Sequence, residues 1–279
     1  MDQFHEKFQQ AANAIKEADA LFITAGAGIG VDSGLPDFRG NSGFWKAYPP
    51  IAALGKSFSE MANPEWFDTN PKIAWAFYGH RLNLYRETKP HHGFKMLLES
   101  AKLKEYGYFI YTSNVDGQFQ KAGFNDAFIE ECHGSIHHFQ CIRPCCSEIW
   151  DASKIKVEVD LEKFEAMGQL PHCNRCGSIA RPNILMFNDW SWLSHRSVGQ
   201  GDRLQLWMET MADLKAKVAI VEMGAGHDIP TVRLKSQRVF RGLNASFIRI
   251  NPRDSEVPYG AIGLPFGAKE GLERIFELM

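Results

Sequence analysis

Short apolar runs, each bounded by polar or glycine-containing segments, recur along the chain. Runs of five or six residues without strict alternation are typical of strands buried on both faces of a parallel sheet. The pattern predicts an α/β fold with a doubly wound parallel, Rossmann-like sheet, whose working residues would lie at the carboxyl ends of the strands. The predicted strands are residues 20–24, 108–112, 127–131, 218–223 and 247–251.

The spacing of these runs predicts two insertions into the sheet. A strand-helix-strand unit needs about 30 residues, whereas roughly 80 separate the first two runs. Residues 73–86 are rich in helix formers, so the first insertion is predicted to be helical. A second gap, 131–218, contains all six cysteines. We expect a Rossmann-like domain at 1–40, 101–134 and 215–279, a helical insertion at 41–100 and a cysteine-containing module at 135–214, with an amphipathic helix opening the chain.

Composition narrows the class of protein. The 279 residues include 31 Lys and Arg against 33 Asp and Glu, a net charge of −2, so no basic excess indicates nucleic-acid binding. The uncharged stretch at 20–31 is too short to span a bilayer, and the charged first residues lack the apolar region of a secretory signal. We therefore expect a cytoplasmic protein without a nucleic-acid or membrane partner.

Six cysteines lie close together in the sequence, all between Cys132 and Cys176. A disulfide scaffold would spread them along a short secreted chain, so the clustering favours a metal site. Cys141-x3-Cys145 and Cys173-x2-Cys176 supply four thiolates at a spacing that suits a tetrahedral structural zinc ion. Four protein ligands would leave no position open for substrate.

The ligand set has alternatives within the same segment. Cys146 could replace Cys145, and His137, His138 or His172 could replace one of the thiolates. We prefer Cys145 because Pro144 precedes it and favours the tight turn of a zinc knuckle.

A glycine-rich loop, Thr24-Ala-Gly-Ala-Gly-Ile-Gly30, follows the first predicted strand. Its small residues would let backbone N–H groups approach a pyrophosphate. The loop continues through Ser33-Gly-Leu-Pro-Asp-Phe-Arg39 and resembles the NAD-binding loop of the sirtuin family of NAD-dependent protein deacylases. Segments similar to other sirtuin motifs follow in the expected order: Thr112-Ser-Asn-Val-Asp116, Cys132-His-Gly134, Arg181-Pro-Asn-Ile-Leu-Met-Phe-Asn-Asp189, and more weakly Gly224-Ala-Gly226 and Ile250-Asn251.

The resemblance implies an enzyme that consumes NAD, removes acyl groups from lysines of a protein or peptide substrate, and carries structural zinc. It implies that His133 acts as general base, with Asn114 and Asp116 beside it. The residues support these roles, because both polar side chains follow a predicted strand and His133 follows the next one, beside a glycine. The residues expected to bind NAD are Gly26, Ala27, Gly28, Asp37, Phe38, Arg39, Ser113, Asn114, Asp116, Gly224, Ala225, Gly226 and Asn251.

Four residues are expected to face the substrate. Leu185 and Phe187 lie in the segment that resembles the substrate-facing stretch of the family. Tyr78 and Arg81 are three apart on a predicted helix, and sirtuins that prefer succinyl- or malonyl-lysine carry a similar Tyr-x-x-Arg pair. The alternative interpretation is an aromatic packing residue beside a surface arginine, which has the same spacing.

The sequence leaves other functions open. They are ADP-ribosyl transfer or NAD hydrolysis on the same fold, and a non-enzymatic NAD or ADP-ribose sensor.

Overall fold

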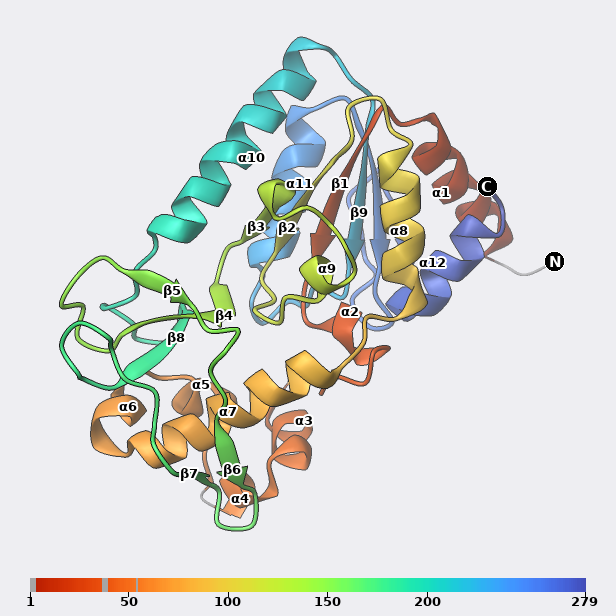
Figure 1. Cartoon of the computed structure of the whole chain (residues 1–279). Coiled ribbons are helices and arrows are strands. Elements are labelled where there is room, and N and C mark those ends of the chain that lie inside the picture. The colour runs from red at the N-terminus through yellow and green to blue at the C-terminus, as the bar shows by residue number, and fades with distance from the viewer. Residues whose placement is uncertain (1–3, 37–39, 54) are drawn as a thin grey trace.

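The computed structural model describes residues 4–36, 40–53 and 55–279. Within these residues, six parallel strands form the central sheet in the order β11-β10-β9-β1-β2-β3 (Figure 1). Numbered along the chain, this is the 3-2-1-4-5-6 order of the Rossmann fold, so the predicted doubly wound sheet is confirmed. The strands are β1 (Ala20–Ala25), β2 (Tyr108–Thr112), β3 (Ile129–Glu131), β9 (Val218–Met223), β10 (Ala245–Ile250) and β11 (Ile262–Leu264).

Two strand predictions differ from the structure. The run predicted at 127–131 begins as a 3-10 turn, η1 (Asp126–Phe128), because Oδ1 of Asn125 accepts a hydrogen bond from N of Ala127 at 3.0 Å. Only the second half of that run is strand. The short β11 was not predicted, because three residues with a central glycine give too little apolar pattern.

Helices cover both faces of the sheet (Figure 1). Successive residues of β1 point to opposite faces, so that Ile23 belongs to one core cluster and Phe22 to the other. The Ile23 face is covered by α1 (His5–Glu17), α8 (His92–Lys102) and α12 (Ala268–Phe276), and the Phe22 face by α10 (His195–Asp213) and α11 (Thr231–Gly242).

A second lobe with its own apolar core is built from the two insertions. Its longest helix, α7 (Pro71–Glu87), begins with a cap from Asn70 and is joined to the neighbouring sheet by the Trp75 indole, which donates to the Ala180 carbonyl at 3.0 Å. The lobe's other elements are α3 (Gly40–Ala47), α4 (Pro49–Ala53), α5 (Phe58–Met61), α6 (Glu65–Thr69), β4 (Gly134–Cys141), β5 (Ile149–Asp151), β6 (Glu158–Asp160), β7 (Glu165–Met167) and β8 (Ala180–Ile184).

Strands β4, β5 and β8 form an antiparallel sheet, and β6 pairs with β7. Two short helices, α2 (Gly28–Val31) and α9 (Gln118–Lys121), follow β1 and β2 at the carboxyl edge of the central sheet. None of the described helices is long and apolar enough to cross a membrane.

Candidate functional site

A cavity of about 770 Å³ opens at the carboxyl edge of the central sheet, toward the second lobe. It lies at the point where the strand order reverses, between β1 and β9, which is where doubly wound folds bind ligands. Residues after β1, β2, β3 and β9 line the sheet side, and residues of α5, α7 and the segment after β8 line the opposite side. The cavity therefore joins the two lobes.

The floor of the cavity is made by the glycine turns that follow β1 and β9. Gly224 adopts a φ of +61°, and a Cβ at this position would come within 2.3 Å of N of Ile29. A Cβ on Gly26 would meet the Gly224 carbonyl oxygen at 2.8 Å, and N–H of Gly28 donates to that oxygen at 3.0 Å. Two backbone turns thus touch without side chains, an arrangement that leaves room for a pyrophosphate close to the backbone.

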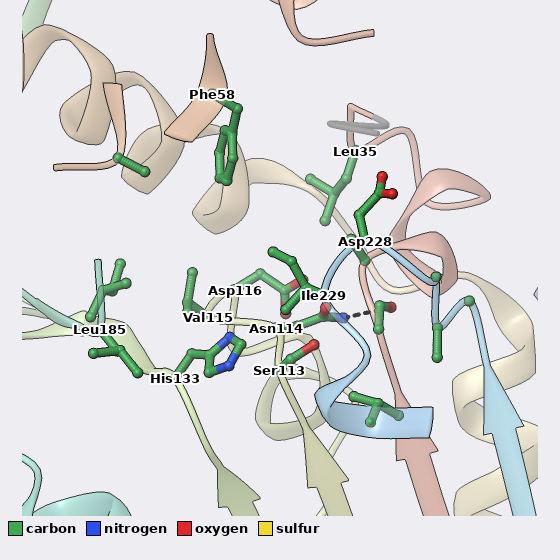
Figure 2. A pocket seen from close by; sticks show the side chains of 18 of the residues that line it. Leu35, Phe58, Ser113, Asn114, Val115, Asp116, His133, Leu185, Asp228 and Ile229 are labelled. Carbon is green, nitrogen blue, oxygen red and sulfur yellow. Dashed lines mark hydrogen bonds between the residues drawn. The ribbon is translucent and has the colours of Figure 1, made fainter. Parts of the chain in front are cut away.

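Asn114 and Asp116 follow β2 and line the cavity, as the sequence predicts. The Asn114 side chain donates from Nδ2 to the Gly26 carbonyl oxygen at 3.1 Å, which ties the β2 loop to the glycine turn (Figure 2). Asp116 is buried, and burial raises the pKa of its carboxyl to about 6 although N–H of Gln118 donates to it.

His133 follows β3 and lies near Ser113 and Asn114 in the cavity (Figure 2). Burial lowers the pKa of its imidazole below the ordinary value, an effect partly offset by a hydrogen bond to the backbone of Ser113. The ring is therefore neutral near pH 7, the form that can accept a proton.

The segment after β8 forms the wall beside this histidine. N–H of Leu185 donates to the His133 carbonyl at 3.0 Å, and N–H of Phe187 donates to the Ala62 carbonyl at 2.8 Å. Leu185 and Phe187 each expose more than a third of their surface although they line the cavity. Two exposed apolar side chains beside the cavity suit contact with an extended apolar or peptide ligand.

The opposite wall contains the pair from α7. Tyr78 and Arg81 are 1% and 6% exposed, so the alternative of a surface arginine is wrong. The Tyr78 hydroxyl is buried without a hydrogen-bond partner among the described residues, and burial raises its pKa to about 12. The phenol stays protonated and can donate to a ligand.

The four predicted cysteines come together at the end of β4, where their sulfur atoms all lie within 4.8 Å of one another. The Cys141–Cys176 and Cys145–Cys173 sulfur distances are both 3.6 Å, close to the separation of about 3.8 Å that a tetrahedron with Zn–S bonds of about 2.3 Å requires. The site fits zinc, and Cys145 rather than Cys146 completes the group of four.

Not every residue expected to bind NAD lines the cavity. Asp37, Phe38 and Arg39 lie outside the described residues. Gly26, Ala27, Ser113 and the turn Gly224-Ala225-Gly226 line it, whereas Gly28 and Asn251 do not. Asn251 is fully buried and donates to the Ala225 carbonyl at 2.8 Å, so it supports the turn from below.

Several lining residues were missed by the sequence reasoning. Tyr85 had a usable signal, since it stands four residues after Arg81 on the same helix face. The others belong to loops or, for Phe58, to the short helix α5, and their approach to the cavity depends on the tertiary fold. They include Leu35, Phe58, Ala62, Val115, Met186, His227, Asp228 and Ile229.

Comparison with known proteins agrees with this geometry. The model of the Sir2 family matches residues 26–198. An NAD-dependent protein deacylase of Pyrococcus abyssi is 33% identical over 64% of this chain and 65% of its own length, and one of Thermus thermophilus is 27% identical over 96% and 93%. The chain thus spans just under two thirds of the Pyrococcus relative.

A solved ADP-ribose complex of a Sir2 homologue variant covers 100% of this chain, and this chain covers 96% of it, with a TM-score of 0.70 and 24% identity. That likeness concerns the fold. Since the family model covers more than half of the sequence and its motifs meet at one cavity, the chain belongs to the Sir2, or sirtuin, family.

Proposed function

We propose that this protein is an NAD-dependent protein-lysine deacylase that releases nicotinamide and O-acyl-ADP-ribose. One observation carries the proposal: the glycine turns, the Asn114–Asp116 loop and His133 meet at one cavity that continues along Leu185 and Phe187. This combination offers a dinucleotide site, a neutral base and a peptide-facing wall in contact with one another. The names of the Pyrococcus and Thermus relatives support the same reaction.

The glycine turns would hold the pyrophosphate of NAD, and Ser113, Asn114 and Asp116 would orient the nicotinamide half. Bound NAD supplies an electrophilic ribose carbon, from which nicotinamide leaves as the acyl oxygen adds. His133, neutral near pH 7 because of its burial, would take the proton of a ribose hydroxyl. Leu185 and Phe187 would cover the lysine side chain and keep water from the reacting carbon.

For the acyl group, we propose a chain that ends in a carboxylate, such as succinyl or malonyl. Arg81 can bind a carboxylate through two parallel hydrogen bonds, and the Tyr78 hydroxyl can donate a further one. The support is that both groups line the cavity and that the Tyr78 hydroxyl has no partner among the described residues. Burying an unpaired phenol is unfavourable unless a ligand satisfies it.

The test is mass spectrometry of reactions that contain NAD and acetyl-, succinyl- or malonyl-lysine peptides. We expect deacylated peptide, nicotinamide and O-acyl-ADP-ribose in equal amounts, with the succinyl or malonyl peptide favoured roughly 10- to 150-fold, the worth of a charged hydrogen bond. Arg81→Met should lower kcat/KM for succinyl-lysine far more than for acetyl-lysine. Arg241→Met, on an exposed position of α11, is the matched control.

Other products would overturn the proposal. ADP-ribose attached to a protein would favour ADP-ribosyl transfer, free ADP-ribose alone would favour NAD hydrolysis, and NAD binding without turnover would favour a sensor. Equal turnover of acetyl- and succinyl-lysine would leave deacylation standing and refute the acyl preference.

A further inference from the structure

Tyr85 lies one helical turn beyond Arg81 and contacts its guanidinium directly. Nε–H of Arg81 donates to the Tyr85 hydroxyl at 3.0 Å, and both side chains line the cavity with 5% and 6% of their surface exposed. Residues four apart on a helix stand above one another, so the contact follows from α7 itself. Nε–H of Arg81 is therefore used in a hydrogen bond within the protein.

Tyr85 is in turn fixed by the loop that carries Asp116. The Gln118 side chain donates from Nε2 to the Tyr85 carbonyl at 3.1 Å, and N–H of Gln118 donates to Oδ1 of Asp116 at 3.0 Å. A chain of hydrogen bonds thus leads from the β2 loop on the cofactor side, through Gln118 and Tyr85, to Arg81. It couples the two walls of the cavity.

Aromatic rings confine the guanidinium on its other sides. Its central carbon lies 5.1 Å from the ring centre of Phe77, 5.6 Å from that of Tyr78 and 5.5 Å from that of Tyr85. Rings at these distances stabilise a cation and restrict its tilt. Tyr85 is the ring whose hydroxyl accepts from Nε of Arg81, so this hydrogen bond ties the rotation of the planar group to the next turn of α7.

We propose that Tyr85 is a specificity-positioning residue: by holding Nε of Arg81, it turns the terminal nitrogens toward the carboxylate of a succinyl- or malonyl-type acyl chain. The inference rests on the proposed function for its substrate. A guanidinium without this anchor keeps its charge but loses the orientation that a bidentate pair requires. Loss of the Tyr85 hydroxyl should therefore lower the turnover of peptides with acidic acyl chains and leave that of peptides with neutral acyl chains unchanged.

A double-mutant cycle tests the inference. The measured quantity is the ratio of kcat/KM for a succinyl-lysine peptide to that for an acetyl-lysine peptide. Tyr85→Phe should lower this ratio about tenfold, mainly by raising KM for the succinyl peptide, and should lower it no further in an Arg81→Met background. Tyr108→Phe is the matched control, since it removes a phenol bond to N of Asn125 outside the cavity.

Two results would overturn the role of Tyr85. One is a Tyr85→Phe variant that slows both peptides equally, which indicates a structural role. The other is a further fall of the ratio in the Arg81→Met background, which indicates an action that does not pass through the guanidinium.

A measurement without turnover separates this inference from the proposed function. If mass spectrometry finds no deacylation, the proposed function fails, and the same cycle is measured on the dissociation constants of the two peptides by fluorescence anisotropy. The exchange rate of the Arg81 Nε–H, identified in ¹⁵N spectra by its loss in Arg81→Met, should rise at least tenfold in Tyr85→Phe. An unchanged exchange rate, or equal affinity of the parent protein for both peptides, refutes the positioning role.

Discussion

Arg181 and Asp189 form an ion pair in which neither side chain is exposed. Nη1 of the arginine donates to Oδ1 of the aspartate at 3.0 Å, and its Nη2 also donates to the Ile184 carbonyl at 2.8 Å. The aspartate accepts from N–H of Met186 and Ser191 as well. The pair closes the segment after β8 into a loop whose outward residues, Leu185 and Phe187, face the cavity.

Removing the charge of Asp189 should destabilise the protein strongly. Asp189→Asn keeps the shape but leaves the Arg181 guanidinium buried without a counter-charge, which costs about 3–5 kcal/mol. Urea unfolding should show this loss in the free energy of unfolding. Asp68→Asn, which breaks the exposed pair with Arg143, is the control and should cost less than about 1 kcal/mol. Equal losses in the two variants would contradict a structural role for the buried pair.

Replacing His133 by alanine should abolish deacylation without unfolding the protein. The imidazole sits at the cavity edge, so its loss removes a proton acceptor and little core, and turnover should fall at least about 10²- to 10⁴-fold. Far-UV circular dichroism and zinc content should match the parent protein. His92→Ala, at an exposed position at the start of α8, is the control. Near-normal turnover by folded His133→Ala would refute the assignment.

Asp116 should make the protein less stable as pH rises from about 4 to 6. Its folded pKa of about 6 lies above the value of 3.8 expected for an unfolded chain. The folded state therefore binds the extra proton in this interval, and the free energy of unfolding falls by about 3 kcal/mol as the proton leaves. The free energy of unfolding of the parent minus that of Asp116→Asn should fall by that amount from pH 4 to 7, because the asparagine does not titrate. A constant difference would mean that Asp116 titrates normally.

The four-cysteine site should hold one zinc ion per chain, as tetrahedral thiolate coordination implies. Cys145→Ser should lose the metal and expose the module around β4, β5 and β8 to proteolysis, because binding free energy is folding free energy in such modules. Cys146→Ser is the matched control and should keep its zinc. Loss of zinc from Cys146→Ser but not from Cys145→Ser would identify Cys146 as the ligand. Metal-free parent protein of full stability would refute the site.

The sequence predicted those features of the site that follow from the order and spacing of motifs along the chain. Asn114, Asp116 and His133 could be assigned to one sheet edge because each follows an apolar run, and parallel strands end together. The cysteine pairs could be assigned from their spacing together with Pro144, which favours Cys145 over Cys146. The anchoring of Arg81 by Tyr85 could not be predicted, since the helix spacing does not say which face is buried. Likewise, the sequence could not show that the Asn251 amide donates to the Ala225 carbonyl, because side-chain direction depends on the packing of β10 against β9. That Asn251 binds NAD stays a prediction.

The glycine turns after β1 and β9, which form the floor of the cavity, limit which positions of this site can vary in sequence. Where Gly26 and Gly224 meet, the surface is bare peptide, so there is no side chain whose exchange could adjust affinity, and any added methyl group would push the two turns apart. Variation in cofactor preference must therefore come from the rim, where Ser113 and Asp228 carry side chains into the cavity (Figure 2). A library built to alter nucleotide use should leave the glycines fixed and sample those two positions.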